Sequence, residues 1–238
     1  MANTAPPNII ITGAFRSGTT LLYLMFPHAF KDVAISGDET DALDTFLPAD
    51  RKWRVSKRPN DIHRVRILTE RLDPYFIYLI RDPRDCVVSW KAVKNDYHLS
   101  FNEWLRNLLF AESARTEKLL FLRYEDMVLK PSETQVRLVA GIPGLEKAED
   151  LAECSRLIDA NSPIAHQLTH DSGPERDGQT VRPLDRSPIG AWRHDKRRVR
   201  DQLSAFPEMQ AALEKYGYEA DDAWQADLDE VETKTGAS

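Results

Sequence analysis

The sequence has few cysteines and no long hydrophobic run. Its 238 residues include two cysteines, Cys86 and Cys154, which neither suggest a disulfide framework nor form a C-x-x-C pair. No stretch approaches the roughly 20 apolar residues of a membrane span. Residues 1–7 lack the basic and apolar regions that begin a secretory signal. We therefore expect a cytoplasmic protein with no integral membrane segment.

The charge distribution gives little support for nucleic-acid binding. The formal net charge is −6, and the stretch from Glu219 onward accounts for all of it, with seven acidic residues against Lys234. We expect this acidic tail, residues 219–238, to be flexible. The rest of the chain is balanced but contains two basic stretches, residues 51–66 and 176–200. These stretches suggest either a small polyanionic ligand or ordinary solvated helix faces, whereas a protein basic overall would suggest nucleic acid.

A lysine is missing from a glycine-flanked turn near the start of the chain. Residues 13–20 read Gly-Ala-Phe-Arg-Ser-Gly-Thr-Thr and follow three isoleucines at 9–11. A buried strand that leads through such a turn into a helix cradles phosphate on backbone N–H groups. In a nucleoside-triphosphate P-loop a lysine would stand in place of Thr19, whereas here the nearest cation is Arg16. The turn therefore predicts an anionic nucleotide held without that lysine, and it argues against an ATPase or GTPase.

Short apolar runs alternate with helical patterns, which is typical of βαβ units. The predicted strands cover residues 8–12, 32–36, 53–57, 75–80 and 119–124. The predicted helices cover residues 19–30, 60–72, 83–95 and 101–117, and the chain beyond Pro131 is mainly helical. Residues 161–188 are polar with little periodicity, which favours a functional or mobile loop. We expect a three-layer α/β/α fold with a central parallel sheet, as in P-loop nucleoside-triphosphate hydrolases, plus a mainly helical C-terminal part.

A second anion site is predicted where the strongest internal strand ends. Residues 81–85 read Arg-Asp-Pro-Arg-Asp, and Ser89 stands eight residues after Arg81. An arginine at the carboxyl end of a parallel strand lies where open α/β sheets bind ligands. An arginine fork with a nearby hydroxyl suits a phosphate monoester. The alternative is an arginine that is ion-paired with Asp82 or Asp85.

At these two places the sequence resembles the sulfotransferases that use 3′-phosphoadenosine 5′-phosphosulfate (PAPS). Residues 16–20 match the family's K/R-[ST]-G-T-[ST] loop, which binds the 5′-phosphosulfate. Arg81 and Ser89 match the R-x-P-x-D signature and its following serine, which bind the 3′-phosphate. Residues 122–127 resemble the Y-E-D-[LM] strand end, and residues 187–193 resemble the I-G-x-W segment that closes over the nucleotide.

The resemblance implies an enzyme that moves the sulfuryl group of PAPS onto a hydroxyl of a small-molecule or carbohydrate acceptor. The transfer is an in-line displacement that releases 3′,5′-ADP. It implies no metal, because sulfate carries less charge than a γ-phosphate and has less need of a magnesium bridge. The implied architecture is a single domain, residues 1–218, with a phosphosulfate loop at 13–20, a 3′-phosphate site at 81–89 and a mobile lid at about 161–193.

The cosubstrate-binding residues implied by these motifs are Arg16, Ser17, Gly18, Thr19, Thr20, Arg81, Ser89, Tyr124, Arg186, Trp192 and Arg193. Tyr124 resembles an adenine contact, although a buried tyrosine at a strand end gives the same pattern. Trp192 packs either on the nucleotide or against the last helices. Arg186 and Arg193 flank it and are candidates for extra contacts with the 3′-phosphate.

Arg16 and Lys57 are the implied catalytic cations. Arg16 and the N-terminus of the helix after the loop direct positive charge towards the bridging oxygen of the departing 3′,5′-ADP. Lys57 ends a predicted strand where related enzymes often have K-[ST]-P, and its implied role is to steady the sulfuryl group or the leaving oxygen. Arg58 replaces the small hydroxyl residue of that pattern. A surface lysine at a strand end is the alternative interpretation.

Glu39 is the predicted general base for the acceptor hydroxyl. It follows the second predicted strand, where carbohydrate-type members often place an acidic base. A carboxylate beside Arg16 and Lys57 would stay ionised, as a base must be. Asp38 is its rival, and both alternatively belong to a solvated acidic helix start. Cytosolic aryl and steroid members use a histidine instead, and His98 is the candidate for that role.

Two other functions remain open from the sequence. A P-loop kinase acting on a small molecule or nucleotide would need ATP and magnesium, and the missing loop lysine argues against it. A non-catalytic nucleotide-binding protein with a degenerate site is less favoured, because Arg16, Lys57, Arg81 and Ser89 are all present.

Overall fold

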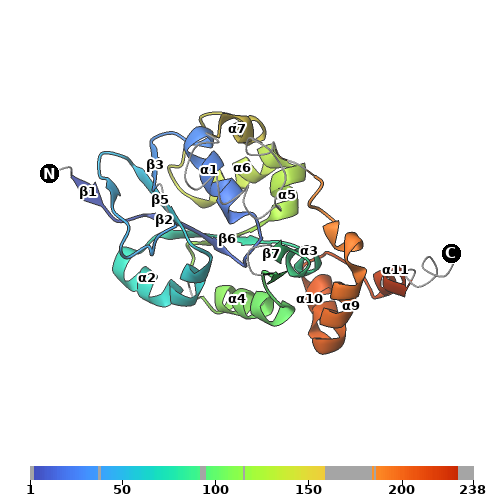
Figure 1. Ribbon diagram of the computed structural model, residues 1–238. Coiled ribbons are helices and arrows are strands. Elements are labelled where there is room, and N and C mark those ends of the chain that lie inside the picture. The colour runs from blue at the N-terminus through green and yellow to red at the C-terminus, as the bar shows by residue number, and fades with distance from the viewer. Residues whose placement is uncertain are drawn as a thin grey trace.

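Five parallel strands form the central sheet of the protein (Figure 1). The computed structural model describes residues 3–36, 39–91, 95–114, 116–158, 184 and 186–229. The strand order is β3 (Val33–Ile35), β5 (Trp53–Lys57), β2 (Ile9–Gly13), β6 (Tyr75–Ile80) and β9 (Leu119–Arg123). Every neighbouring pair is parallel. The carboxyl ends of the strands therefore meet at one edge of the sheet, where open α/β folds bind ligands.

Helices cover both faces of this sheet (Figure 1). On one face lie α1 (Thr19–Ala29), α5 (Tyr124–Leu129), α6 (Pro131–Gly141) and α7 (Leu151–Cys154), and on the other α2 (Val65–Leu72) and α4 (Phe101–Ser113). Ile77 and Leu79 of β6 pack into the core with α1, whereas Tyr78 and Ile80 pack into the core with α4. Burial on both faces explains why β6 is an uninterrupted run of apolar and aromatic residues. The predicted three-layer α/β/α fold with a central parallel sheet is confirmed.

The remaining elements are short, apart from two C-terminal helices. They are β1 (Thr4–Ala5), β4 (Leu47–Pro48), the 3₁₀ helix η1 (Pro59–Arg64), α3 (Pro83–Val87), β7 (Trp90–Lys91), β8 (Asp96–Tyr97), η3 (Ser155–Leu157), η4 (Ala191–His194), α9 (Lys196–Ala205), α10 (Glu208–Lys215), η5 (Ala223–Gln225) and α11 (Ala226–Asp229). The helices α9 and α10 share one core cluster with α3 and α4. None of the helices in the described part of the chain is both long and apolar enough to cross a membrane.

The helix predicted over residues 83–95 is wrong beyond Val87. The helix α3 ends there, and Ser89 lies in the turn that follows. The strands β7 and β8 then pair as an antiparallel hairpin, with the rings of Trp90 and Tyr97 edge to face and their centroids 5.0 Å apart. Two successive valines at the end of α3 lower the helix propensity, and the cross-strand aromatic pair favours the hairpin.

Residues 219–229 differ from the flexible acidic tail that composition predicts. Glu219 forms an ion pair with Arg84 at 2.6 Å. The Trp224 side chain is buried, with its ring 4.6 Å from the Arg84 guanidinium and 5.7 Å from the ring of Trp192. The acidic composition conceals one large apolar side chain, and its burial holds the segment against the domain. The predicted domain boundary at 218 is therefore too early.

Replacing Trp224 with alanine is expected to lower the free energy of unfolding by about 3–5 kcal/mol, as for other buried aromatic side chains. Chemical denaturation followed by circular dichroism measures the change. Val136→Ala, at a side chain that is 67% exposed, is the control and should change stability by less than about 0.5 kcal/mol. Equal effects of the two substitutions would contradict the packing of this segment. The rest of the predicted tail, residues 230–238, lies outside the described residues.

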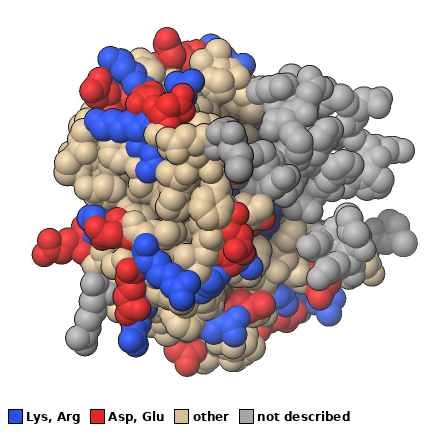
Figure 2. Space-filling view, turned by 90° about the vertical axis from the view of Figure 1, so that its left-hand side faces the viewer, with Lys and Arg blue, Asp and Glu red and all other residues tan. Residues whose placement is uncertain are grey.

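Acidic partners neutralise much of the basic stretch at 51–66. Arg58 Nη1 lies 2.8 Å from Asp41 Oδ2, and the same oxygen accepts a bond from Arg64. Figure 2 shows acidic and basic side chains interspersed over one face of the protein. Of the two interpretations of this basic stretch, a solvated helix face and a site for a polyanionic ligand, the first therefore holds for these two arginines. In the second basic stretch, residues 176–183 lie outside the described part of the chain.

Candidate functional site

The loop between β2 and α1 is shaped to hold an anion. A Cβ at Gly13 would lie 2.5 Å from Leu79 O, and a Cβ at Gly18 would lie 2.5 Å from Tyr124 Cδ2. Gly18 has a φ of 89°, in the left-handed region that favours glycine. The helix α1 begins directly after it, so the N–H groups of its first turn, which find no acceptor within a helix, face the loop. This cradle fits the phosphate end of a nucleotide.

Arg16 joins the loop to the second predicted site. Its Nε donates to Ser89 Oγ at 2.9 Å, and its carbonyl oxygen accepts from Arg81 Nη1 at 2.9 Å. Arg16 has a φ of 69°, which is uncommon for arginine, and the bond from Arg81 helps to hold that conformation. These partners are 65 and 73 residues away in the sequence. The neighbouring parallel strands β2 and β6 bring them to the same edge of the sheet.

Arg81 is buried and connects several parts of the site. Its guanidinium also donates to Pro188 O at 2.6 Å and lies 4.5 Å from the centre of the Tyr124 ring. The alternative ion pair with Asp85 is present as well, at 3.7 Å. The Nε atom of Arg81 has no hydrogen-bond partner among the described residues. A buried N–H without an acceptor is costly, so this atom is an unsatisfied donor at the carboxyl edge of the sheet.

Two buried carboxylates that were not among the predicted ligand-binding or catalytic residues hold this site together. Asp85 accepts main-chain N–H bonds from Gly190 at 2.9 Å and from Trp192 at 3.0 Å. Glu125 accepts the main-chain N–H of Asp82 at 3.0 Å. Burial raises the pKa of both carboxyl groups. The available signals were the last residue of the R-x-P-x-D signature and the glutamate of the Y-E-D motif.

Trp192 belongs to the core and does not present an open face to a nucleotide. Only 1% of its surface is exposed, and its ring lies 4.5 Å from the Arg84 guanidinium and 5.7 Å from the ring of Trp224. Of the two predicted positions of Trp192, the structure shows the second. The ring packs against the C-terminal elements, and these contacts leave no face for a nucleotide. Tyr124 is also buried and packs against Gly18 at the floor of the loop.

The two arginines proposed as extra ligands are both exposed. Arg193 lies with its guanidinium 4.4 Å from the Trp192 ring, and Arg186 precedes it in the same segment. Most of the predicted lid at 161–193, from 161 to 183, lies outside the described residues.

The predicted catalytic lysine and the predicted base form an ion pair. Lys57 Nζ lies 2.7 Å from Glu39 Oε2, and 3% of the lysine side chain is exposed against 27% of the glutamate. Lys57 stands opposite Ile11 in β2, just before the first glycine of the loop. The alternative of a surface lysine is therefore wrong. A buried ammonium group needs a compensating charge, and Glu39 supplies it.

The two rival bases are placed differently. Asp38 lies outside the described residues. His98 is half-buried and donates its main-chain N–H to Ser89 O at 2.9 Å, so it belongs to the turn on the Arg16 side of the site. The contact with Lys57 favours Glu39.

Alanine at Gly18 is expected to cost more stability than alanine at Gly217. Both glycines have positive φ, 89° and 68°, so each substitution loses about 1–2 kcal/mol of backbone energy. At Gly18 the new methyl group also meets the Tyr124 ring, which adds about 1–3 kcal/mol of overpacking. At Gly217 the nearest atom is 3.7 Å away, on Arg123, so no clash is added. Thermal unfolding of both variants measures the difference, and equal losses would contradict the tight packing of the loop on Tyr124.

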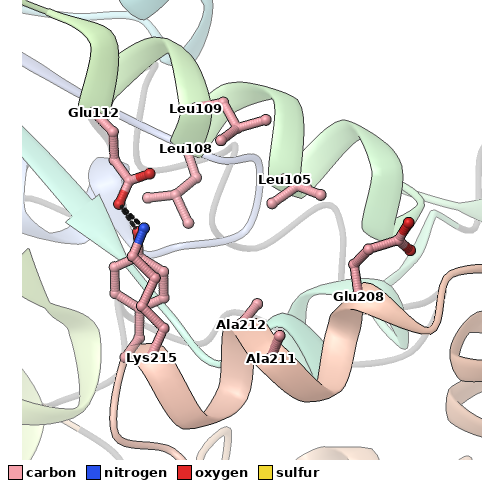
Figure 3. Close-up of a pocket in the computed structure, with 9 residues that line it drawn as sticks. Leu105, Leu108, Leu109, Glu112, Glu208, Ala211, Ala212 and Lys215 are labelled. Carbon is pink, nitrogen blue, oxygen red and sulfur yellow. Dashed lines mark hydrogen bonds and ion pairs between the residues drawn. The ribbon is translucent and has the colours of Figure 1, made fainter.

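A cavity of about 190 Å³ between α4 and α10 contains none of these residues (Figure 3). Leucine and alanine side chains of the two helices line it, and the Glu112–Lys215 ion pair at 2.6 Å lies at one end. Its apolar wall offers little to a phosphate group. The candidate site therefore lies at the carboxyl edge of the sheet and not in this cavity.

Both the sequence and the fold match known sulfotransferases. The sequence model of the family described as Sulfotransferase domain matches residues 6–155, more than half of the chain. No curated protein matches the sequence.

Mouse sulfotransferase SULT7A1, solved in complex with PAP, has 15% identity and a TM-score of 0.54, and the match covers 88% of this chain and 89% of that chain. A sulfotransferase from Alicyclobacillus acidocaldarius has 12% identity and a TM-score of 0.48, with 93% of this chain and 99% of that chain covered. The structural likeness concerns the fold, and the family match shows that this protein belongs to the sulfotransferase family, as the resemblance at its two motifs predicted.

Proposed function

We propose that the protein transfers the sulfuryl group of PAPS to a hydroxyl of a small-molecule or carbohydrate acceptor and releases 3′,5′-ADP. The observation that carries this proposal is the Lys57–Glu39 ion pair beside the phosphate loop. It combines a buried cation, needed where negative charge develops, with a carboxylate able to take up a proton. We assign this activity to one domain that includes the packed segment around Trp224.

The loop and the strand-end site contain the residues that would hold PAPS. The N–H groups of residues 17–20, together with the hydroxyls of Thr19 and Thr20, would bind the 5′-phosphosulfate. Ser89 and the Nε of Arg81 suit the 3′-phosphate, because one offers a hydroxyl and the other an unsatisfied donor. When bound, PAPS supplies an electrophilic sulfur and a 3′,5′-ADP leaving group. The proposal assigns no role to a metal ion.

Glu39, Lys57 and Arg16 have different roles in the transfer. Glu39 accepts the proton of the acceptor hydroxyl while the hydroxyl oxygen forms its bond to sulfur. Lys57 donates hydrogen bonds to the oxygens that gain negative charge as the bond from sulfur to 3′,5′-ADP breaks. Arg16 and the N-terminus of α1 add positive potential at the same place. Lys57 and Glu39 must loosen their 2.7 Å bond for these tasks, so the pair exchanges partners when both substrates bind.

Isothermal titration calorimetry with 3′,5′-ADP and, separately, with Mg-ATP tests the proposal. We expect 3′,5′-ADP to bind in the absence of metal and Mg-ATP to bind far more weakly. Binding of Mg-ATP alone would overturn the proposal in favour of a kinase. Mass spectrometry of hydroxylated metabolites and glycans incubated with enzyme and PAPS would then identify the acceptor. Binding of 3′,5′-ADP without turnover on any acceptor would instead favour a non-catalytic nucleotide-binding protein.

A further inference from the structure

Arg81 and Asp85 hold the segment 188–192 by its main chain. Arg81 Nη2 donates to Pro188 O at 2.6 Å. Asp85 Oδ2 accepts the N–H of Gly190 at 2.9 Å, and Asp85 Oδ1 accepts the N–H of Trp192 at 3.0 Å. All three bonds use backbone atoms of the segment, so they fix its path whatever side chains it carries.

Asp85 is fully engaged in this contact. Both carboxylate oxygens accept a hydrogen bond, only 1% of the side chain is exposed, and the Arg81 guanidinium lies 3.7 Å away. A buried carboxylate with two N–H donors and a facing cation is well compensated. Because it is covered, Asp85 acts through the segment and not by touching a ligand.

The segment lies beside the phosphate loop. The Arg81 guanidinium that binds Pro188 O also donates to Arg16 O at 2.9 Å, and Arg16 in turn donates to Ser89 Oγ. The loop and the segment 188–192 therefore meet at the Arg81 guanidinium, and the turn after α3 contacts the loop through Arg16. Arg81 thus transmits any displacement of the segment to the residues proposed for the 3′-phosphate.

We propose that Asp85 is a positioning residue that sets the affinity of the site for the 3′-phosphate of the cosubstrate. It keeps the segment 188–192 in place against Arg81, whose guanidinium also contacts Arg16 O. The inference rests on the proposed function, because it concerns the same cosubstrate. A purely electrostatic role would change the affinity in the opposite direction. The charge of Asp85 reduces the positive potential of Arg81, so its removal alone would tighten binding of the 3′-phosphate. The sign of the change in affinity therefore separates positioning from simple electrostatics.

Calorimetry with 3′,5′-ADP and with 5′-AMP measures this effect, because the two ligands differ only in the 3′-phosphate. Asp85→Asn is expected to weaken 3′,5′-ADP binding about tenfold and 5′-AMP binding by less than about twofold. In the transfer assay the KM for PAPS should rise by a similar factor, while kcat at saturation stays close to that of the wild type.

Two further variants complete the experiment. Gly190→Ala disturbs the segment from its other side, because the residue has a φ of 75° and a Cβ would lie 2.7 Å from Arg193 Nη1. It leaves Asp85 intact, it should show the same selective loss, and it decides the matter if Asp85→Asn does not fold. Asp150→Asn is the control. Asp150 accepts the N–H of Ala152 at the start of α7, outside the site, and asparagine caps a helix about as well as aspartate, so both affinities should stay unchanged.

Three outcomes would count against the inference. Unchanged affinity for 3′,5′-ADP in the folded variants would reduce Asp85 to a structural residue. Tighter binding in Asp85→Asn would show that its charge, and not its positioning of the segment, dominates. A wild-type protein that binds 3′,5′-ADP no better than 5′-AMP would overturn the proposed cosubstrate site itself and, with it, the role of Asp85.

Discussion

The Glu39→Gln variant is expected to lose sulfuryl transfer by a factor of about 10²–10⁴ in kcat, which is the usual contribution of a general base. Glutamine keeps the size of the side chain but cannot take the proton of the acceptor hydroxyl. Its amide oxygen can still accept a bond from Lys57 Nζ, so folding and 3′,5′-ADP binding should persist. The kcat at saturating PAPS and acceptor measures the loss, and calorimetry with 3′,5′-ADP checks the site.

A matched control separates a base from a carboxylate that only forms an ion pair. Glu146→Gln is the matched control, since Glu146 forms an exposed ion pair with Lys31 at 3.4 Å. Such pairs contribute little, so kcat should not change. Full activity of Glu39→Gln, combined with loss of activity in Asp38→Asn or His98→Asn, would contradict the assignment of Glu39.

The Lys57→Met variant is expected to lose about 10²–10³ in kcat, as when a donor to developing negative charge is removed from other active sites. Methionine fills the buried space of the lysine stem without its charge. Glu39 is 27% exposed, so water can solvate it once the ammonium group is gone, and the fold should hold. The loss should appear in kcat, with the affinity for 3′,5′-ADP little changed.

Lys31→Met is the control for this substitution, because it removes a lysine from an exposed pair with glutamate. The double variant of Lys57 and Glu39 should lose less than the sum of the two single effects in free energy, because the residues contact each other. A normal kcat in Lys57→Met with a raised KM for PAPS would show that the lysine only binds the cosubstrate.

The elements predicted well from the sequence are those with strong local patterns. The strands at 53–57 and 75–80 begin and end at the expected residues. At 75–80 the apolar side chains, buried on both faces of a parallel sheet, leave a continuous signature. The helix beyond Val87 was overestimated, because a cross-strand pair of aromatic rings decides the hairpin and pairing is not a local property. The tail was misjudged because its average composition hides the packing of Trp224.

The same distinction applies to the candidate site. Arg16, Arg81 and Ser89 come together as expected, because parallel strands deliver their carboxyl ends to one edge. The role of Asp85 could not be predicted, because its partners are backbone N–H groups 105 and 107 residues away, which leave no mark in the choice of side chains. A motif also does not give the orientation of a ring, so the sequence left two positions open for Trp192, on the nucleotide or against the last helices, and the structure has it buried in the core.

The distant partners of residues in α3 also impose an order on the folding of the protein during its synthesis. A nascent chain emerges from its N-terminus at about 5–20 residues per second, so the strands of the sheet are complete well before Gly190 and Glu219 appear. Until then Asp85 and Arg84 lack these distant partners and have only the nearby ones, Arg81 and Asp82. The sheet can assemble early, but the surroundings of Asp85 and Arg84 are completed only when the C-terminal elements dock. The contacts that hold the segment 188–192 are thus among the last to form.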